Sequence, residues 1–374
     1  MIEQMEKTLS PTSLPPEIPI LGFDRIEFYV GNAKQAANYY TEFMGFDGLG
    51  FKGPETGSRD TVSYLLAQNN IRFVLTSALD PDHPVARHFH QHGDGVKDIG
   101  LLVEDTVSAY ETAIARGAVS VKAPFTEEDE HGKIIKATIQ AYGETTHTFV
   151  QRNHYYGTLE PEFESRPQPS KSIGLQQIDH MVANVEEGGM DEWVAFYQNV
   201  FGFYVLRHYD EKDISTQYSA LVSKVMANKS GTIKLPINEP AKGLRKSQIQ
   251  EYLDFYHSAG IQHMAIATRD IRETVQALRD HKVTLMTVPA TYYEDLAKRI
   301  GDIREPLEEL AKLGILADRD DGGYLLQIFT QPIQDRPTFF FEIIQREGAD
   351  GFGKGNFKAL FEAIERDQER RGNL

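Results

Sequence analysis

Three polar residues interrupt apolar, strand-like stretches in the second half of the chain. They are His180 in IDHMVANV, His263 in IQHMAIAT and Glu342 in FFFEIIQR. Side chains alternate along a strand, so each of these residues shares its strand face with apolar neighbours. A carboxylate in such a setting is costly unless a cation or hydrogen bonds compensate it. The three residues together predict a metal site.

The ligand set alone admits more than one metal. Two imidazoles and one carboxylate bind Fe(II) in oxygenases and leave positions open for substrate and oxygen. Zinc takes the same donors in hydrolytic sites. A single histidine at the start of a strand more often has a hydrogen-bonding role. The prediction therefore depends on the three residues together and on an internal repeat of the chain.

The two halves of the sequence resemble each other. Each half contains strand-like segments followed by an amphipathic helix, and three pairs of segments match: 23–30 with 178–185, 96–103 with 261–268, and 148–152 with 342–346. At the positions of the three candidate ligands the first half carries Arg25, Asp98 and Thr148. These residues cannot make the same site, so we expect metal only in the C-terminal half.

The repeat also predicts the fold class. It indicates an α+β protein of two homologous halves, each built of paired βαβββ modules that form a curved, open, barrel-like sheet around a cavity. The segment between the halves is rich in Pro, Glu and Ser and is expected to be a linker. We expect an N-terminal domain without metal ligands at 1–157, a linker at 158–173, and a catalytic domain with a C-terminal lid helix at 174–374.

Composition excludes several classes of function. The chain has 374 residues and a net charge of -16, which disfavours nucleic acid and anionic membranes as partners. It has no cysteine, so thiolate metal sites, disulfides and cysteine nucleophiles are excluded. The sequence shows no secretory signal and no apolar stretch long enough to span a bilayer, so we expect a cytoplasmic protein.

Two other motifs resemble ligand-binding motifs, but we do not expect either of them to bind a ligand. The first is PDHPVARHFHQHGDG, with His83, His88, His90 and His92, which we interpret as a solvated turn and helix end. The second is the glycine run at 351–356, which lacks the GK[ST] ending of a phosphate loop. It is better interpreted as a hinge before an amphipathic helix that packs its apolar face or closes over a cavity.

Several motifs together resemble one enzyme family. The segments IDHMV, LPINEPA, GIQHMAIAT, FFFEIIQR and GFGKGNFKALFEAIE are similar to those of the 4-hydroxyphenylpyruvate dioxygenases, in the vicinal-oxygen-chelate group. The resemblance implies Fe(II) held by His180, His263 and Glu342. It also implies polar residues around the substrate, Gln248, Gln262, Asn238, Ser223 and Gln327, and a pocket formed by Pro236, Phe329, Phe340, Phe352, Asn356, Phe357 and Phe361.

The same resemblance implies a reaction. The expected substrates are the 2-oxo acid 4-hydroxyphenylpyruvate and O2, and the expected products are homogentisate and CO2, a step of tyrosine and phenylalanine catabolism. The family is commonly dimeric or tetrameric, so we expect a homo-oligomer. Two alternatives remain: a 4-hydroxymandelate synthase with the same substrate and ligands, and a glyoxalase-like or extradiol metalloenzyme on the same scaffold.

Overall fold

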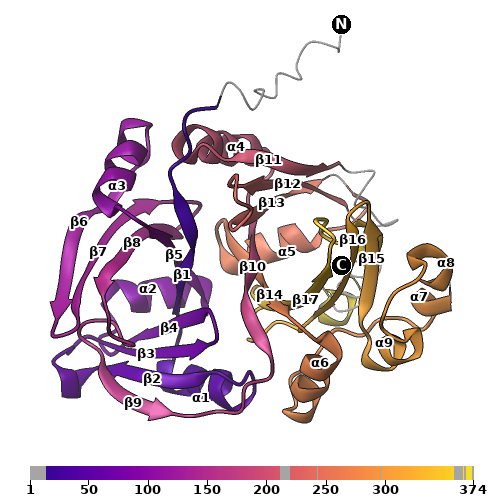
Figure 1. Cartoon of the computed structure of the whole chain (residues 1–374), viewed down its shortest axis with the longest axis horizontal. Coiled ribbons are helices and arrows are strands. Elements are labelled where there is room, and N and C mark those ends of the chain that lie inside the picture. The colour runs from indigo at the N-terminus through magenta and orange to yellow at the C-terminus, as the bar shows by residue number, and fades with distance from the viewer. Residues whose placement is uncertain are drawn as a thin grey trace, which may run out of the picture.

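The structure is a computed structural model, and it describes residues 14–210, 220–241, 243–294, 296–357, 365 and 368–372. The fold is α+β and consists of two strongly curved sheets, one from each half of the chain. Figure 1 shows the N-terminal half on the left, in indigo and magenta, and the C-terminal half on the right, in orange and yellow. The predicted fold class is confirmed.

The N-terminal half forms a nine-stranded mixed sheet in the described part of the chain, in the order β6-β7-β8-β5-β1-β4-β3-β2-β9. Its elements are β1 (Ile20–Tyr29), α1 (Ala33–Glu42), β2 (Asp47–Lys52), the 3₁₀ turn η1 (Pro54–Thr56), β3 (Thr61–Gln68), β4 (Ile71–Ala78), α2 (Pro84–His92), β5 (Gly95–Val103), α3 (Thr106–Ala115), β6 (Ser120–Asp129), β7 (Gly132–Gln140), β8 (Thr146–Tyr155) and β9 (Glu164–Gln168).

The C-terminal half forms an eight-stranded sheet from described residues, in the order β11-β12-β13-β10-β14-β17-β16-β15. Its elements are β10 (Leu175–Asn184), α4 (Met190–Phe196), the π-helical turn η2 (Tyr197–Phe201), β11 (Tyr204–Tyr209), β12 (Ala220–Ala227), β13 (Lys234–Ala241), α5 (Gln248–Tyr256), β14 (Gly260–Thr268), α6 (Ile271–Asp280), α7 (Thr291–Glu294), α8 (Leu296–Ile300), α9 (Leu307–Leu313), β15 (Leu316–Asp320), β16 (Gly323–Phe329), β17 (Phe340–Glu347) and the 3₁₀ turn η3 (Lys354–Asn356).

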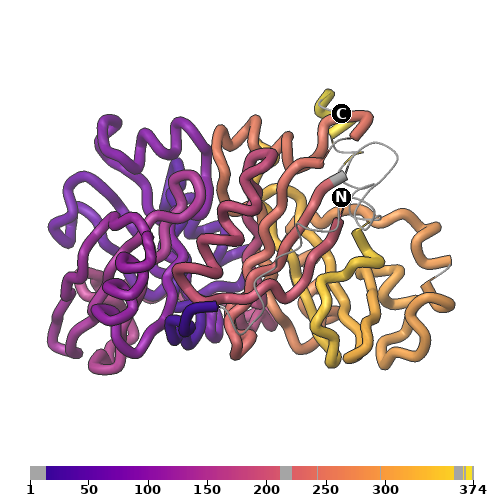
Figure 2. Tube along the Cα trace, turned by 90° about the horizontal axis from the view of Figure 1, so that it is seen from above, coloured from indigo at the N-terminus to yellow at the C-terminus, as the bar shows by residue number. Residues whose placement is uncertain are grey.

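One continuous apolar core joins the two halves, which lie side by side in Figure 2. Aromatic rings meet across the junction: Phe28 of the first sheet packs edge-on against Phe339, with ring centroids 5.3 Å apart. Phe73 stacks on Phe341, with centroids 6.2 Å apart. Aromatic pairs of this kind add to the stabilisation that burial provides. The two sheets are therefore held in a fixed relation close to the residues that precede Glu342.

The segment expected to be a linker takes part in the first sheet. Its strand β9 pairs with β2 at the edge of that sheet, with Gly50 opposite Ser165. Glu160 of the same segment is buried and hydrogen-bonds to Arg25. The segment therefore also pairs with the open edge of the first sheet and supplies an anion to its buried cations.

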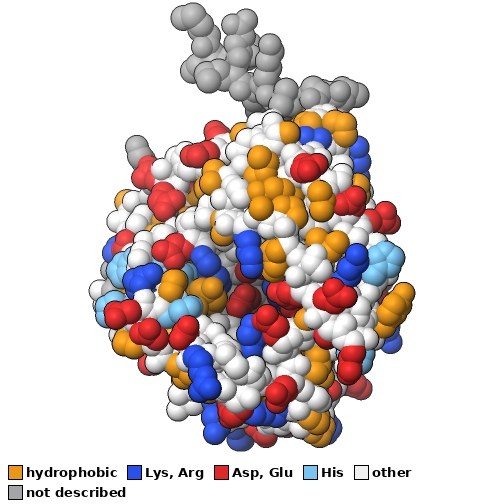
Figure 3. Space-filling view, turned by 90° about the vertical axis from the view of Figure 1, so that its left-hand side faces the viewer, with side chains coloured by type: hydrophobic (Ala, Val, Ile, Leu, Met, Phe, Trp, Pro, Cys, Tyr) orange, Lys and Arg blue, Asp and Glu red, His pale blue; other side chains and the backbone are white. Residues whose placement is uncertain are grey.

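Figure 3 shows acidic and basic side chains interspersed over the face on the left of Figure 1, without a broad basic area. Among the described residues, no helix is both long and apolar enough to cross a membrane.

Candidate metal centre and substrate pocket

Strand register brings the three predicted ligands together. The central strand β14 pairs antiparallel with β10, which sets His180 opposite Ala265, and parallel with β17, which sets Glu342 opposite the same Ala265. His263 lies two residues before Ala265, so its side chain projects from the same face of the sheet. All three side chains are buried. The small side chain of Ala265 leaves room between them.

The donor atoms of the three residues converge. Nε2 of His180 lies 3.3 Å from Oε2 of Glu342, and Nε2 of His263 lies 3.5 Å from the same oxygen. One ligand atom from each residue lies within 4.8 Å of the other two. Ligands bound about 2.0–2.2 Å from a divalent ion, at roughly right angles, lie about 3 Å apart. The spacing of the three donors therefore fits such an ion.

Neighbouring groups orient both imidazoles. Nδ1 of His180 lies 2.7 Å from a carboxylate oxygen of Asp179, and Nδ1 of His263 lies 3.0 Å from the amide oxygen of Gln262. Arg346 donates to both oxygens of Asp179, at 2.7 and 2.8 Å. When an oxygen atom accepts a hydrogen bond from Nδ1–H, the proton of the neutral ring stays on Nδ1, and Nε2 carries the free lone pair. Both rings thus present a ligand nitrogen to Glu342.

A relay of hydrogen bonds also orients the carboxylate. Gln327 donates through Nε2 to Oε1 of Glu342 at 2.9 Å, and Asn356 donates to Oε1 of Gln327 at 2.8 Å. Tyr292 in turn donates to Oδ1 of Asn356 at 2.6 Å. Gly353 has a φ of 77°, and a Cβ there would lie 1.8 Å from the Gln327 side-chain oxygen. Glycine is thus required where η3 passes over this relay.

The electrostatics favour an ionised Glu342. Burial by itself raises the pKa of this carboxyl, but the adjacent His180 and His263 outweigh burial and bring the pKa to about 2. For a histidine, burial has the opposite sign, and it lowers the pKa of His263. At His180, Glu342 and Asp179 outweigh burial and raise the pKa. An anionic carboxylate beside two imidazoles is the donor set that a divalent cation compensates.

The site opens into a cavity of about 570 Å³, including the part that is open to solvent. The sheet provides most of its wall and α5 closes one side. Ser247 caps α5 by accepting from the backbone of Gln250, which fixes Gln248 in the first turn. The lining residues are His180, Val182, Tyr209, Leu221, Ser223, Val225, Pro236, Asn238, Gln248, Gln262, His263, Gln327, Phe329, Phe340, Glu342, Phe352 and Phe357.

Phenylalanine rings pack directly on the imidazoles. Phe340 stacks on His263, with centroids 4.9 Å apart and planes inclined by 17°. Phe352 meets His180 edge-on at 5.0 Å, and Phe329 meets His263 edge-on at 6.2 Å. The cavity therefore combines an apolar, aromatic wall with a set of polar groups, as sites for small organic ligands do.

Comparison with known proteins agrees with this geometry. The family described as the Glyoxalase/Bleomycin resistance protein/Dioxygenase superfamily matches residues 22–146 and 177–328, once in each half. The 4-hydroxyphenylpyruvate dioxygenase of Dictyostelium discoideum is 50% identical over 365 residues, covering 94% of this chain and all of that protein. The chain belongs to the 4-hydroxyphenylpyruvate dioxygenase family.

Other members of the family are similar over the same length. The 4-hydroxyphenylpyruvate dioxygenase of Xenopus tropicalis is 47% identical, covering 95% of this chain and 93% of its own. Among solved structures, a mutant of 4-hydroxymandelate synthase from Streptomyces coelicolor matches with a TM-score of 0.84 and 32% identity. That match covers 94% of this chain and 99% of the other.

Most residues that the family resemblance implied line the cavity. Asn356 does not line it and is buried behind Gln327. Phe361 lies outside the described residues, together with most of the expected lid helix. Four residues of the apolar wall were not predicted from the sequence: Val182, Tyr209, Leu221 and Val225. Strand alternation gives a signal for three of them, since each lies two residues from His180 or Ser223. Tyr209 and Tyr292 had no such signal.

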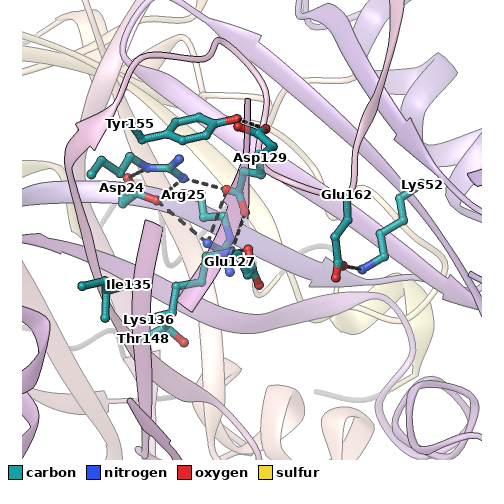
Figure 4. Close-up of polar contacts among 12 residues, drawn as sticks. Asp24, Arg25, Lys52, Glu127, Asp129, Ile135, Lys136, Thr148, Tyr155 and Glu162 are labelled. Carbon is teal, nitrogen blue, oxygen red and sulfur yellow. Dashed lines mark hydrogen bonds and ion pairs between the residues drawn. The ribbon is translucent and has the colours of Figure 1, made fainter. Parts of the chain in front are cut away.

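The N-terminal half carries charged residues where the C-terminal half has the metal centre (Figure 4). Arg25 donates to Glu160 at 3.3 Å, and Lys136 donates to the same carboxylate at 2.7 Å. Asp98 accepts from Thr148 at 2.8 Å. Cations and anions compensate one another inside this sheet, so the residues that replace the ligands have internal partners.

The interpretation of the histidine tract as solvated is wrong for two of its members. His88 and His92 are buried on the inner face of α2, at 3% and 0% exposure. The i, i+4 spacing puts both on one helix face. There they pack against Tyr256 of α5, which follows far later in the sequence. His90 is exposed, as expected.

Proposed function

We propose that His180, His263 and Glu342 hold Fe(II), and that the enzyme converts 4-hydroxyphenylpyruvate and O2 to homogentisate and CO2. The observation that carries the proposal is the convergence of two oriented imidazoles and one ionised carboxylate at the base of an apolar cavity. This ligand set is typical of Fe(II) oxygenases, in which one face of the ion stays open. Relatives of the chain with this activity extend over almost its whole length.

The iron, when bound, supplies the sites for chelating the 2-oxo acid and for activating O2, while the protein supplies orientation and exclusion of water. Two neutral imidazoles and one carboxylate leave the Fe(II) centre with a net charge of about +1. This charge attracts the anionic substrate. Asp179 and Gln262 accept hydrogen bonds from Nδ1 of the two imidazoles, which places the proton of each neutral ring on Nδ1 and leaves the Nε2 lone pair for the metal.

Uncharged polar groups are placed to orient the phenol and the side chain of the substrate. Ser223 and Asn238 lie opposite each other on β12 and β13, and both line the cavity. Gln248 enters from α5 and Gln262 from β14. Amides and hydroxyls donate or accept hydrogen bonds without changing the charge of the site. These four side chains would fix the substrate ring relative to the metal, while the net charge of the site is set by the metal and its three ligands.

The phenylalanines hold the aromatic ring and exclude water. Phe329 and Phe340 come from adjacent strands, whereas Phe352 and Phe357 come from the segment that follows β17. An apolar wall strengthens the interactions of the polar groups inside it, because water no longer competes. We propose that Phe361 and the helix beyond Phe357 complete the closure as a lid, with the glycines of 351–356 as the hinge.

The other expectations of the family resemblance are part of the same proposal. These are a scaffold domain at 1–157, a connecting segment at 158–173 and a catalytic domain at 174–374. They also include a homo-oligomer, dimeric or tetrameric, located in the cytoplasm. Sedimentation analysis of the purified protein tests the assembly state, and a fusion to a fluorescent protein tests the location.

Identification of the product tests the reaction. The purified protein is reconstituted with Fe(II) without oxygen, then given 4-hydroxyphenylpyruvate and O2, and the products are analysed by mass spectrometry. We expect homogentisate with an equal amount of CO2. Hydroxymandelate instead would keep the site and identify the alternative synthase. Absence of oxygen uptake with the 2-oxo acid would contradict the proposal and favour a glyoxalase-like or extradiol reaction.

A further inference from the structure

A second group of potential metal ligands lies in the N-terminal half, between α2 and the turn that joins β7 to β8. It consists of His88 and His92 of α2 and Glu144 of the turn, and we call it the α2 cluster. One ligand atom from each residue lies within 4.8 Å of the other two. Histidines at i and i+4 of a helix are a common chelating pair for zinc-type ions. The catalytic site uses none of these residues.

Both imidazoles face the same carboxylate oxygen. Nδ1 of His88 lies 2.7 Å and Nε2 of His92 lies 3.6 Å from Oε2 of Glu144. These distances are close to the separation of about 3.3 Å between donors around a tetrahedral ion with bonds of 2.0–2.1 Å. The carboxylate side chain is 46% exposed. Water can therefore reach the positions that the three residues leave open.

His92 is already oriented as a metal ligand. Its Nδ1 contacts the main-chain oxygen of Tyr256, and its ring stacks on the Tyr256 ring at 4.5 Å and 30°. A backbone carbonyl on Nδ1 is the usual outer partner of a ligating histidine and leaves Nε2 to the metal. Among the described residues, this Nε2 is buried and has no hydrogen-bond partner. A buried ring nitrogen without a partner needs an explanation, and a bound cation provides one.

The charges of the cluster suit a cation of moderate affinity. Burial lowers the pKa of His88 to about 4 and lowers that of His92, so both rings are neutral near pH 7. A cation would displace the proton of His88 Nδ1, which now donates to Glu144 at 2.7 Å. The pKa of Glu144 is lowered too, because its contacts with His88 outweigh burial. Lys97 opposes a cation, although its ammonium contacts the main-chain oxygen of Glu144 and not the carboxylate.

We propose that the α2 cluster binds a divalent cation of the zinc type through two imidazoles and one carboxylate. The ion would tie α2 to the β7–β8 turn. Through His92 and the Tyr256 carbonyl it would also brace the end of α5, whose first turn carries the pocket residue Gln248. The site is structural and lies across the junction of the two halves. Nitrogen and carboxylate donors without thiolates suit zinc, and nickel or cobalt can substitute.

Counting bound metal tests the proposal. Protein freed of metal by chelation is dialysed against Zn²⁺, and the bound metal per chain is measured by mass spectrometry. We expect two equivalents for the wild type, one each for Glu342→Ala and Glu144→Gln, and none for the double variant. His90→Gln changes an exposed histidine of the same helix and should keep two equivalents. One equivalent in the wild type, or two in Glu144→Gln, would overturn the proposal.

Two further readouts guard against a folding artefact. In the Glu342→Ala background, Zn²⁺ should raise the thermal midpoint, and Glu144→Gln should abolish the rise, because a ligand stabilises only the state that binds it. Lys97→Met removes the opposing charge and should lower the dissociation constant for Zn²⁺ several-fold. An unchanged dissociation constant in Lys97→Met, or a rise in midpoint that survives Glu144→Gln, would count against the α2 cluster.

Discussion

The two halves of the chain share one scaffold but use it for different purposes. In each half an arginine of the last matched strand forms a bidentate ion pair with an aspartate of the first: Arg346 with Asp179, and Arg152 with Asp24. The pairs occupy equivalent positions. In the C-terminal half, however, Asp179 also accepts a hydrogen bond from Nδ1 of His180. The ion pair therefore belongs to the scaffold, and the metal site makes additional use of it.

The positions next to these ion pairs differ. Strand register confirms that these positions are equivalent, since Gly100 pairs with Thr148 in the first half as Ala265 pairs with Glu342 in the second. Gln327, which holds Glu342, corresponds to Lys136, which holds Glu160. Among the described residues, the buried anion Glu342 of the C-terminal half has no arginine or lysine partner and is available to a metal. In the N-terminal half, Arg25 and Lys136 compensate the buried anion Glu160. The same curved sheet can thus enclose a reaction site or a set of ion pairs.

The largest expected effect comes from the ligand position itself. Glu342→Gln should lower homogentisate formation by about 10³-fold or more, or about 4 kcal/mol, because the metal loses its anionic ligand. The matched change Thr148→Val in the N-terminal half removes a hydroxyl and should leave turnover within about twofold. Steady-state oxygen uptake measures both. A comparable loss in Thr148→Val would contradict the assignment of chemistry to one half.

The buried ion pairs of the first half should dominate its stability. Glu160→Gln removes the carboxylate that faces Arg25 and Lys136, and should cost about 3 kcal/mol of unfolding free energy at pH 7. Burial by itself raises the pKa of Glu160, but the neighbouring cations hold it well below 4.5. Its folded pKa lies below its unfolded pKa, so the stabilisation is present above pH 4.5 and is lost as pH falls through the folded pKa.

Urea unfolding between pH 7 and pH 3 tests this dependence. The difference between wild type and Glu160→Gln should be constant from pH 7 to about pH 5 and should shrink below pH 4.5. Turnover of the folded variant should be unchanged. A difference that stays constant down to pH 3 would mean that the charge of Glu160 does not stabilise the fold.

Substitution of the two equivalent arginines distinguishes a role in orienting a metal ligand from a role in stabilising the fold. Arg346→Met leaves Asp179 without its bidentate partner, so the orientation of His180 is lost and the affinity for Fe(II) should fall by about 10–100-fold. Arg152→Met breaks the equivalent pair with Asp24 and should destabilise the fold without changing that affinity. Iron titration and thermal unfolding of both variants distinguish the two effects. Equal affinities for Fe(II) would show that Arg346 has only a structural role.

The smallest effect concerns two serines at equivalent positions. Ser223→Ala removes a hydroxyl from the cavity wall and should raise KM several-fold with little change in kcat. Ser63 hydrogen-bonds to Thr76 at 2.8 Å, so Ser63→Ala should cost about 1 kcal/mol of stability and leave KM unchanged. Steady-state kinetics with 4-hydroxyphenylpyruvate gives the first result. A raised KM in Ser63→Ala would remove the contrast between the halves.

Sequence periodicity predicted the repeat, the fold class and the three converging ligands. It succeeded there because alternation fixes which face a strand residue occupies, and because Glu342 is an isolated anion in an apolar run. It could not predict that the side chain of Glu160, in the Pro-rich segment, is buried beside cations of the first sheet, since Arg25 lies 135 residues away in sequence. His88 and His92 were misjudged for the same reason: Tyr256, which covers them, lies more than 160 residues away in sequence.

The most direct test of the central claim is a crystal structure of the Fe(II)-reconstituted protein with 4-hydroxyphenylpyruvate, without oxygen, with anomalous data at the iron edge. The anomalous peak should lie between Nε2 of His180, Nε2 of His263 and a carboxylate oxygen of Glu342, with the 2-oxo acid bound on its open face. A pocket without iron in a crystal that turns over when oxygen is admitted, or iron among the charged residues around Arg25, would contradict it.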